Sequence, residues 1–290
     1  MNGPALRVAV RKAYHAEFIG RLPLSSRRRF LYAKSQRRPL HLAAPRTFNE
    51  KVNWRIVNDR RDLLRWTCDK MAMKDAAQST TSSVRIPETL WSGTDLAELM
   101  DIGLPDRWVL KPNHRSNAIH FGSGSPTSME ALRATTLGWM ENFQGETLGE
   151  WAYSQARRAF LVEEWIADGD VAPTDYKLFV FNGVVQLVDV ISERFSDTRC
   201  RLYRPDWTPL KVIYGFPLAE VQEPPAGLDI MVSAAQDVGA GFDFIRVDFY
   251  ETTRGVYFGE TTPYPAGGLT PFTPTWLDHE LGSRWQLPIL

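Results

Sequence analysis

Apolar positions recur at helical spacing in the first quarter of the chain. Thr47 and Glu50 stand three residues apart in a capping-box pattern, in which their side chains bind free backbone N–H groups at a helix start. A helix is therefore predicted to begin there and run through residues 51–66, with its apolar residues on one face. A second helix is predicted over residues 68–78, before a polar loop.

The middle of the chain changes to short apolar runs. A buried strand is predicted over residues 108–110, ending at Lys111, and a polar, glycine-containing loop follows at 114–126. The period of residues 129–143 predicts a helix capped by the Thr-Ser pair before it. Residues 160–166 are predicted to form an apolar strand interrupted by two acids.

Strand signals dominate after residue 170. Two apolar runs flank Asn182-Gly183, a dipeptide that suits the positive φ angles of a tight hairpin turn. Residues 246–250 and 256–260 are predicted to form a second hairpin, and residues 274–285 a last helix. Long strand pairs with interspersed helices favour an α+β fold over a doubly wound parallel sheet.

Charge is balanced over the whole chain but not along it. Lys and Arg total 34, as do Asp and Glu, so net charge predicts no partner. From Arg7 to Arg46 there are eleven Lys or Arg and one acid, Glu17. Such a region either binds an anionic partner, such as nucleic acid, phospholipid or an acidic polymer, or forms a solvated helical face whose counter-charges come from the rest of the fold.

Cysteine use and hydropathy bear on the compartment. Cys68 and Cys200 match no CxxC or zinc spacing, which argues against a disulfide scaffold. No apolar run approaches the ~20 residues that a membrane helix needs. The first residues carry charges where a secretory signal would be apolar. We therefore expect a cytoplasmic protein without a transmembrane segment.

The acidic residues of the second hairpin suggest a metal site. Side chains alternate along a strand, so Arg246, Asp248 and Tyr250 share one face. If Tyr250 pairs with Val256, Arg246 opposes Glu260, and Asp248 lies diagonal to Glu260, ~7–8 Å away at the backbone. Two carboxylates at that separation suit Mg²⁺ completed by phosphate oxygens and water. The alternative is an ion pair between Arg246 and Glu260, with Asp248 in solvent.

The segment after this hairpin combines rigid and flexible backbone. Pro263 and Pro265 make a stiff turn, and Gly267 and Gly268 follow it. The two glycines would allow a ligand to approach the main chain closely. The alternative is a plain loop.

Several lysines are candidates for binding phosphate. Lys70 and Lys74 lie one turn apart on the second predicted helix, and Lys111 ends a strand before a polar loop. Lys177 interrupts an apolar strand and, with a two-residue hairpin turn, shares a face with Arg194. Taken singly, each lysine is more often a surface residue. The chain lacks the GxxxxGK[ST] and GxGxxG nucleotide motifs.

Two acids stand in an apolar strand where an unpaired carboxylate would be costly. These are Glu163 and Glu164. A strand that leads to a hinge would expose backbone groups to an adenine edge, and Asp170 could accept hydrogen bonds from ribose hydroxyls. A buried ion pair plus one exposed acid explains the pattern equally well.

Taken in order, these segments resemble the ATP-grasp superfamily. The shared order is DKxxxK, VLKPN, LVEEWIxDGD, DYK and RVDFY…FGET. PRTFNEKVNW, TDYKLFVFNG, SERF, YFGETTPYP and ELGSRWQLP are similar to its TupA-like branch, named for teichuronopeptide synthesis. The resemblance spans roughly residues 45–290. It implies a small lobe at 67–162 and a large lobe with the metal and substrate site at 163–290, the two lobes clasping ATP. Residues 1–66 are predicted from their own pattern and charge to form a helical basic N-terminal region, in place of the α/β domain common among relatives.

The resemblance also implies a role for each motif. Lys70 and Lys111 would contact the nucleotide phosphates, and Lys177 would reach the phosphate or adenine side from the large lobe. The other implied roles are adenine and ribose binding by Glu163, Glu164, Trp165, Ile166 and Asp170, magnesium binding by Asp248, Glu260 and Thr262, catalysis by Arg246 and Arg194, and substrate contact at Gly267 and Gly268.

The activity that the resemblance implies is ATP- and Mg²⁺-dependent ligation. A small-molecule or polymer-linked carboxylate would become an acyl phosphate with release of ADP, and an amine would attack it to form an amide or peptide bond. A kinase-like phosphotransferase and a non-catalytic ATP-binding protein are the alternatives. Thr262 stands where many relatives have Asn, and Arg115 lies in the expected lid at 114–126, where relatives often have glycine.

Overall fold

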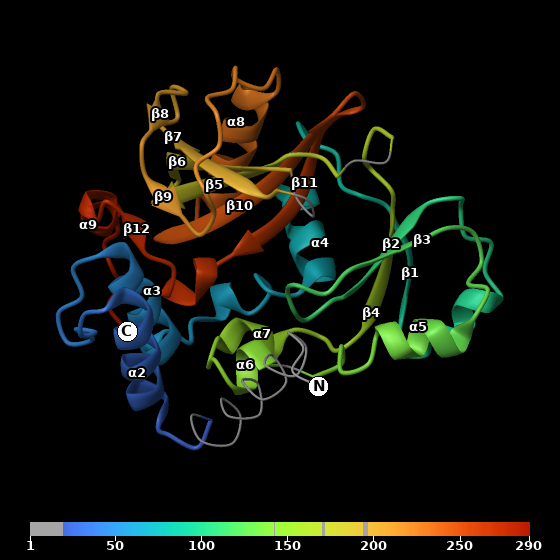
Figure 1. The fold of residues 1–290 in the computed structure, drawn as a ribbon, viewed down its shortest axis with the longest axis horizontal. Helices are drawn as coiled ribbons and strands as arrows, with labels where there is room; N and C mark the ends of the chain where they lie inside the picture. Colours follow the sequence, from blue (N-terminus) through green and yellow to red (C-terminus); the bar gives the residue numbers. More distant parts are fainter. Residues whose placement is uncertain (1–19, 142, 170–171, 194–196) are drawn as a thin grey trace.

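Two antiparallel sheets and their covering helices make up the fold, which confirms the α+β class (Figure 1). The computed structural model describes residues 20–141, 143–169, 172–193 and 197–290. The large sheet contains β5 (Asp175–Phe181), β6 (Val184–Ser192), β7 (Arg199–Tyr203), β8 (Pro209–Leu210), β10 (Phe244–Thr252) and β11 (Gly255–Thr262). The small sheet contains β1 (Thr89–Gly93), β2 (Trp108–Pro112), β3 (His120–Gly122) and β4 (Phe160–Glu164), and a separate pair contains β9 (Ile213–Tyr214) and β12 (Phe272–Thr273).

The large sheet has the strand order β11-β10-β5-β6-β7-β8. The predicted turn between β5 and β6 is confirmed, because Asn182 and Gly183 have positive φ angles of 49° and 76°. One face of the sheet is covered by α8 (Leu228–Gly239). Gly239 lies so close to the sheet that a Cβ there would be 2.6 Å from Cγ1 of Val180, so this contact requires glycine.

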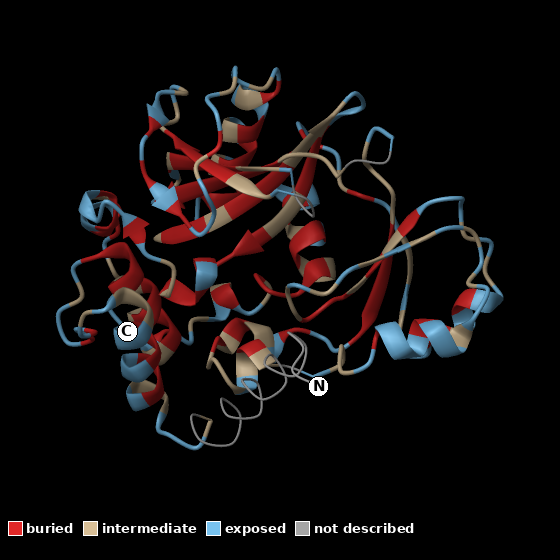
Figure 2. Ribbon diagram, viewed as in Figure 1, coloured by how far each residue is buried: buried red, intermediate tan, exposed pale blue. Residues whose placement is uncertain are grey.

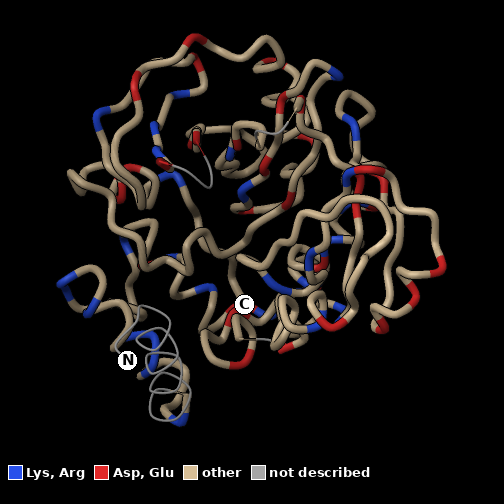
Figure 3. The backbone as a smooth tube through the Cα atoms, turned by 45° about the vertical axis from the view of Figure 1, so that its right-hand side comes forward, with Lys and Arg blue, Asp and Glu red and all other residues tan. Residues whose placement is uncertain are grey.

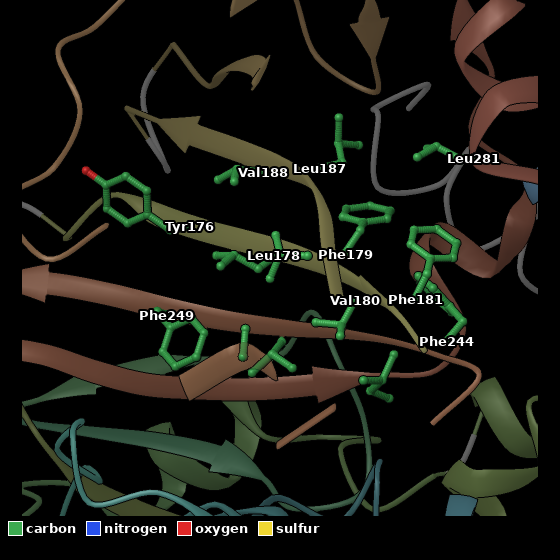
Figure 4. Close-up of a cluster of buried hydrophobic side chains, with 14 of the residues drawn as sticks. Tyr176, Leu178, Phe179, Val180, Phe181, Leu187, Val188, Phe244, Phe249 and Leu281 are labelled. Atoms are coloured by element: carbon green, nitrogen blue, oxygen red, sulfur yellow. The ribbon is translucent and has the colours of Figure 1, made fainter. Parts of the chain in front are cut away.

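The opposite face of the large sheet carries an aromatic core towards one end of its strands. Phe179, Phe181 and Phe244 gather there (Figure 4). They pack against Phe48 at the start of α3 (Phe48–Asn58), and the ring centroids of Phe48 and Phe244 are 5.0 Å apart. The helix α3 is therefore part of the core of the large sheet.

The start of α3 is as predicted, but its end is not. Oγ1 of Thr47 accepts a hydrogen bond from the Glu50 N–H, and the Glu50 carboxylate accepts one from the Thr47 N–H, which confirms the capping box. The prediction of a helix through residue 66 is wrong. The carboxylate of Asp59 accepts hydrogen bonds from the backbone N–H and the side chain of Arg61. The Arg61 N–H is therefore used in a turn and not in a continuing helix.

A buried charge network, consisting of Arg55, Asp59, Arg61 and Asp243, fastens α3 to the large sheet. Arg55 is fully buried and its Nη2 lies 2.6 Å from Oδ2 of Asp243. Asp59, also fully buried, lies 3.6 Å from Nε of Arg55, and Arg61 bridges the two aspartates. The Arg55 guanidinium also lies over the Trp285 ring, 4.4 Å from its centroid.

The basic N-terminal region is partly internal. Lys and Arg residues line α2 (Leu24–Gln36) (Figure 3). However, Arg27 and Arg28 are buried and donate hydrogen bonds to the Thr147 carbonyl and the Asn53 side chain. The reading of a solvated face is therefore wrong for these two residues. An anionic partner for the exposed remainder stays a prediction.

The small sheet has the order β1-β4-β2-β3 and an apolar cluster of its own. Trp108 and Leu110 of β2 pack with Phe160 and Val162 of β4, and all four are buried (Figure 2). The predicted loop at 114–126 is wrong in part, because it contains β3. This short strand pairs with β2 and so uses the backbone hydrogen bonds that the edge of β2 would otherwise leave open.

The helix predicted over residues 129–143 is shorter than expected. It is α5 (Met129–Thr135), capped by Ser128, whose Oγ accepts from the Ala131 N–H. Gly138 has a φ of 75°, a left-handed conformation that interrupts the helical path. The remaining helices are α6 (Phe143–Glu146), α7 (Trp151–Gln155), α9 (Trp276–Arg284), which matches the predicted last helix, and the 3₁₀ turns η2 (Asp62–Leu64), η3 (Leu96–Met100) and η4 (Pro265–Gly268).

The helix α4 (Lys70–Thr80) lies between the two sheets (Figure 1). Asp69 caps it by accepting hydrogen bonds from two N–H groups of its first turn. Met73 contacts β11 through a hydrogen bond from the Thr261 N–H to its sulfur. The predicted ranges of the small lobe (67–162) and the large lobe (163–290) stay predictions. Among the described residues, no helix is long and apolar enough to cross a membrane.

Candidate active site

A pocket lies between the small sheet and the hairpin of β10 and β11. Five of the predicted nucleotide-binding residues line it: Lys111, Glu163, Glu164, Trp165 and Ile166. Phe121 of β3 adds an aromatic wall, with its ring edge-on to Trp165 at 5.3 Å between centroids. Tyr250, Phe258 and Gly259 close the pocket from the large sheet. The walls are mostly apolar, with the charged groups at one side, as in many sites for small molecules.

Glu163 organises two lysines beside this pocket. It is buried, and its Oε1 lies 2.6 Å from Nζ of Lys74 while its Oε2 pairs with Lys111. Burial acts to raise the pKa of Glu163, but the two lysines outweigh it and hold the pKa below its usual value. One carboxylate against two ammonium groups leaves positive charge next to the pocket. Glu164 is more exposed and pairs with Arg254 at 3.0 Å.

The pairing of β10 with β11 corrects the predicted register. Asp248 lies directly opposite Glu260, and Arg246 lies opposite Thr262. The prediction of a diagonal pair is wrong for two reasons: Tyr250 pairs with Tyr257 instead of Val256, and a bulge at Gly259 inserts one further residue into β11. A Cβ on Gly259 would lie 3.0 Å from the Asp248 carbonyl oxygen, so the bulge needs a residue without a side chain. The two carboxylates are direct neighbours on one face.

Asp248 is the most constrained group of this site. It is 1% exposed, so its predicted alternative as a solvated residue is wrong. Nε and Nη2 of Arg246 donate to its two oxygens at 2.7 and 2.6 Å, and Nζ of Lys177 donates at 2.9 Å. Burial acts to raise the pKa of Asp248, but the charges and hydrogen bonds of Arg246 and Lys177 hold it below its usual value. The pKa values of both cations are raised in return, against the opposing effect of their burial.

The side chains of Glu260 and Thr262 differ in how closely they are bound by Arg246. Thr262 accepts a hydrogen bond from Nη2 of Arg246 at 3.1 Å. The Glu260 side chain is 32% exposed, and its nearest cation, Arg246, is 3.5 Å away. Glu260 thus offers an accessible carboxylate beside the buried one of Asp248.

These two carboxylates fit a magnesium ion only together with a ligand. No group of three or more His, Cys, Asp or Glu side chains that could hold a metal occurs in the described part of the chain. Mg²⁺ is commonly held by one or two carboxylates plus substrate phosphates and water. The donor set of Asp248 and Glu260 meets that pattern.

Lys70 connects the site to the expected lid. Its Nζ donates a hydrogen bond to the carbonyl oxygen of Arg115 at 2.7 Å. Burial lowers the pKa of Lys70, and the charge of nearby Glu260 acts against this effect. Lys70 therefore lies between the segment that begins at residue 114 and the carboxylates of the large sheet. Asp170 and Arg194, predicted to bind ribose and to act in catalysis, lie outside the described residues.

The structure places Gly267 and Gly268 against other parts of the protein. Both are buried and have positive φ angles of 57° and 62°. A Cβ on Gly268 would lie 2.6 Å from Nδ2 of Asn53, and one on Gly267 would lie 2.8 Å from Oε1 of Glu150. Close packing against α3 and Glu150 thus accounts for both glycines. Their contact with substrate stays a prediction.

Replacing Glu150 with glutamine is expected to stabilise the protein at alkaline pH. Burial raises the pKa of Glu150 from 4.5 to about 7, although Arg28 acts to lower it. The folded state therefore favours the protonated carboxyl, and this favourable contribution is lost as the pH rises from about 4.5 to 7. The glutamine variant cannot ionise and should be more stable than wild type by about 3 kcal/mol at pH 8, at roughly 1.4 kcal/mol per pH unit.

The check is urea unfolding of both proteins at pH 4.5 and pH 8. The matched control is Glu146→Gln, an exposed carboxylate paired with Arg158. It should change the free energy of unfolding by less than about 0.5 kcal/mol at either pH. An equal effect of the Glu150 substitution at both pH values would show that ionisation is not involved.

Sequence reasoning missed three residues around this site. Asp189 of β6 lies opposite Lys177, Tyr214 of β9 contacts Phe179, the residue opposite Arg246, and Arg254 donates a hydrogen bond to the Trp165 carbonyl. For Asp189 a signal was present, since it interrupts an apolar strand as Lys177 does. Tyr214 lies in the short strand β9, far along the chain from the predicted site residues, so no local pattern pointed to it.

Known proteins provide an independent comparison. No curated protein is recognisably similar in sequence. Among solved structures, the chain is similar to D-alanine–D-alanine ligase from Bacillus anthracis complexed with ATP, at 17% identity and a TM-score of 0.38, over 68% of this chain and 54% of that chain. The D-alanine–D-alanine ligase from Helicobacter pylori has 15% identity and a TM-score of 0.43, over 77% and 59%. The ATP-grasp ligase PsnB complexed with minimal precursor has 11% identity and a TM-score of 0.38, over 70% and 53%.

The chain thus spans a little over half the length of these solved structures. The family model of TupA-like ATPgrasp proteins matches residues 50–286, which is most of the sequence. The chain belongs to the TupA-like ATP-grasp family.

Proposed function

We propose that this protein is an ATP- and Mg²⁺-dependent ligase that joins a carboxylate to an amine through an acyl phosphate, with release of ADP. The observation that carries the proposal is the group of Arg246, Asp248, Lys177 and Glu260 on one face of the large sheet, next to an apolar pocket. Membership of the ATP-grasp family supports it.

The nucleotide would occupy the pocket between the sheets. Adenine would lie among Trp165, Ile166 and the Phe121 ring, with its polar edge at the backbone after β4. The phosphates would extend towards Lys111 and Lys70, where Glu163 leaves positive charge uncompensated. Lys177 would approach the phosphates from the large sheet.

The charged groups would bring together reactants that repel each other. A carboxylate and the γ-phosphate are both anionic, so their approach needs neutralisation. Asp248 and Glu260 would hold Mg²⁺, which when bound would supply that neutralisation between the phosphates and the carboxylate. Lys111 from the small sheet and Lys177 from the large sheet would add positive charge around the phosphates.

Arg246 would bind the oxygen of the acyl group. Its Nε and Nη2 are occupied by Asp248, which orients the guanidinium. Among the described residues Nη1 of Arg246 makes no hydrogen bond, so this N–H group is available for an oxyanion that develops when the amine attacks. Closure of the segment at 114–126 over the pocket would exclude water and protect the acyl phosphate from hydrolysis.

The test is ADP formation by the purified protein with ATP, Mg²⁺ and pools of carboxylates and amines, followed by mass spectrometry. The expected result is ADP release that depends on both the metal and a carboxylate, with a product one water lighter than its two parents. A product heavier by one phosphate would identify a kinase-like enzyme instead. Failure to bind ATP would refute the nucleotide assignment.

A further inference from the structure

The row of charged residues on the large sheet extends beyond the groups assigned so far. Glu260 of β11 faces Asp248 of β10, which faces Lys177 of β5, which in turn faces Asp189 of β6. Residues that are directly opposite in an antiparallel sheet share a face. Asp189 is therefore on the face that carries Arg246, at the end of the row away from the nucleotide pocket. It is 2% exposed.

Asp189 has weak partners for a buried carboxylate. The thiol of Cys200 donates a hydrogen bond to its Oδ1 at 3.0 Å, and a thiol is a weak donor. Lys177, its neighbour on β5, donates to Asp248 instead. No ion pair to Asp189 is present among the described residues. Burial raises the pKa of Asp189 to about 6, although the Cys200 hydrogen bond and the charges of Lys177 and Arg246 act to lower it.

Tyr214 of β9 is a second buried polar residue that packs on this face of the sheet. Tyr214 is 6% exposed, its ring stacks on Phe272 at 4.3 Å, and it also contacts Phe179, which lies directly opposite Arg246. Its hydroxyl has no hydrogen-bond partner in the part of the chain that the structure describes. Burial and the charge of Asp189 raise the pKa of this hydroxyl, and the charge of Arg246 acts to lower it. Buried polar groups are rarely left unpaired in folded proteins, so this hydroxyl points to a ligand.

The chemistry of the three groups indicates which ligand group would fit. A carboxylate accepts hydrogen bonds, and a phenol oxygen accepts one and donates one. Asp189 shares its face of the sheet with Arg246, and the Tyr214 ring contacts Phe179 on that face. An amine or ammonium satisfies the first two. In amide formation the attacking nitrogen and the oxyanion are bonded to the same carbon atom. The group that receives the amine proton must therefore be within reach of the oxyanion donor, and Asp189 lies on the same face of the sheet as Arg246, with β5 between their strands.

We propose that Asp189 and Tyr214 form the binding site for the amino group of the acceptor, with Asp189 as the general base. Asp189 takes one proton from the bound ammonium, and the nitrogen lone pair forms a bond to the acyl carbon. The bond between that carbon and the phosphate oxygen breaks, and the leaving phosphate takes the second proton from nitrogen. Asp189 then returns its proton to solvent. The inference rests on the proposed ligase function and assigns its acceptor site.

Hydroxylamine separates the two halves of the reaction. It attacks acyl phosphates as a neutral molecule and forms hydroxamates, so it needs no base. The experiment uses ATP, Mg²⁺ and a mixture of the protein amino acids as carboxylates, with either hydroxylamine or the same amino acids as acceptors. In Asp189→Asn, we expect amide formation to fall by about 10²–10⁴-fold, the usual contribution of general-base catalysis, and hydroxamate formation to stay within about threefold of wild type.

Two further variants sharpen the result. Tyr214→Phe keeps the ring that stacks on Phe272 and removes only the unpaired hydroxyl; it should raise KM for the amine by about tenfold and leave hydroxamate formation unchanged. Asp237→Asn removes an exposed carboxylate from α8 on the other face of the sheet and should change neither reaction.

The pH profile distinguishes a base from a structural carboxylate. Within the described ranges, the charged or titratable groups that act on Asp189 are Cys200 of β7, Lys177 of β5, Arg246 and Asp248 of β10 and Tyr214 of β9. In wild type, amide formation with saturating amine should rise with pH as Asp189 loses its proton. In Asp189→Asn, the rate should instead increase about tenfold per pH unit from pH 7 to 9, as free neutral amine becomes available.

The outcomes lead to different conclusions. Loss of both amide and hydroxamate in Asp189→Asn would overturn the inference and leave the ligase proposal intact, because the residue would then be needed for the acyl phosphate step or the fold. Unchanged amide formation would overturn it as well. If wild type makes no hydroxamate from these carboxylates, the ligase proposal fails for this substrate class, and the acceptor site fails with it.

Discussion

Replacement of Glu260 with glutamine is expected to lower ATP-dependent product formation by about 10²–10³-fold, the usual effect of losing one electrostatic contact to a transition state. The reason is its position. Asp248 is almost saturated by Arg246 and Lys177, so Glu260 provides the accessible carboxylate of the pair. Glutamine keeps the size of the side chain and removes its charge, which weakens the binding of a divalent cation. Steady-state ADP formation at several Mg²⁺ concentrations measures the effect.

The same variant should fold normally. The Glu260 side chain is 32% exposed, and its ion pair with Arg246 is long at 3.5 Å, so the free energy of unfolding should change by less than about 1 kcal/mol. Glu223→Gln, an exposed carboxylate on the same lobe, is the matched control and should retain wild-type activity. Full activity of Glu260→Gln at low Mg²⁺ would contradict a role in metal binding, whereas a stability loss equal to the activity loss would indicate a structural role.

Replacement of Arg55 with methionine is expected to reduce the free energy of unfolding by about 3–5 kcal/mol, the usual cost of removing one partner from a buried ion pair. The substitution leaves Asp59, which is fully buried, and Asp243 with Arg61 as the cation that remains between them. It also removes the guanidinium from the Trp285 ring. Methionine is chosen because it preserves most of the buried volume and isolates the loss of charge. The measurement is urea unfolding followed by circular dichroism.

Arg65→Met provides the control for this stability prediction. Arg65 pairs with Asp62 at 3.3 Å, but both side chains are largely exposed. Exposed ion pairs contribute little, so its free energy of unfolding should change by less than about 1 kcal/mol. Similar losses in the two variants would mean that the buried network does not fasten α3 to the large sheet.

Local patterns were sufficient for most of the secondary structure. The turn at Asn182-Gly183 depends on backbone preferences of two adjacent residues, and the capping box depends on side chains three residues apart. Both were predicted correctly because the interactions that stabilise them lie within a few residues. The end of α3 was not, since the contacts of Asp59 with Arg61 and Arg55 compete with helix propagation there.

The predicted site shows the same division. The residue types and their order in RVDFY and FGET pointed to a carboxylate pair next to Arg246 before any fold was known. The register of that pair depends on the hairpin, which pairs Tyr250 with Tyr257, and on a bulge at Gly259, where one extra residue brings Glu260 onto the face of Asp248. A sequence pattern of period two does not reveal such an insertion.

Residue order and local spacing were thus enough to indicate the α+β class, the family and the carboxylate, arginine and lysine groups of the predicted site. Tertiary packing decided how those groups are used. It placed Asp248 between Arg246 and Lys177, and it brought Tyr214 from a distant loop to the row that contains Asp189. Secondary structure follows from interactions over a few residues, whereas burial and charge pairing depend on segments that are far apart in the chain and meet only when it folds.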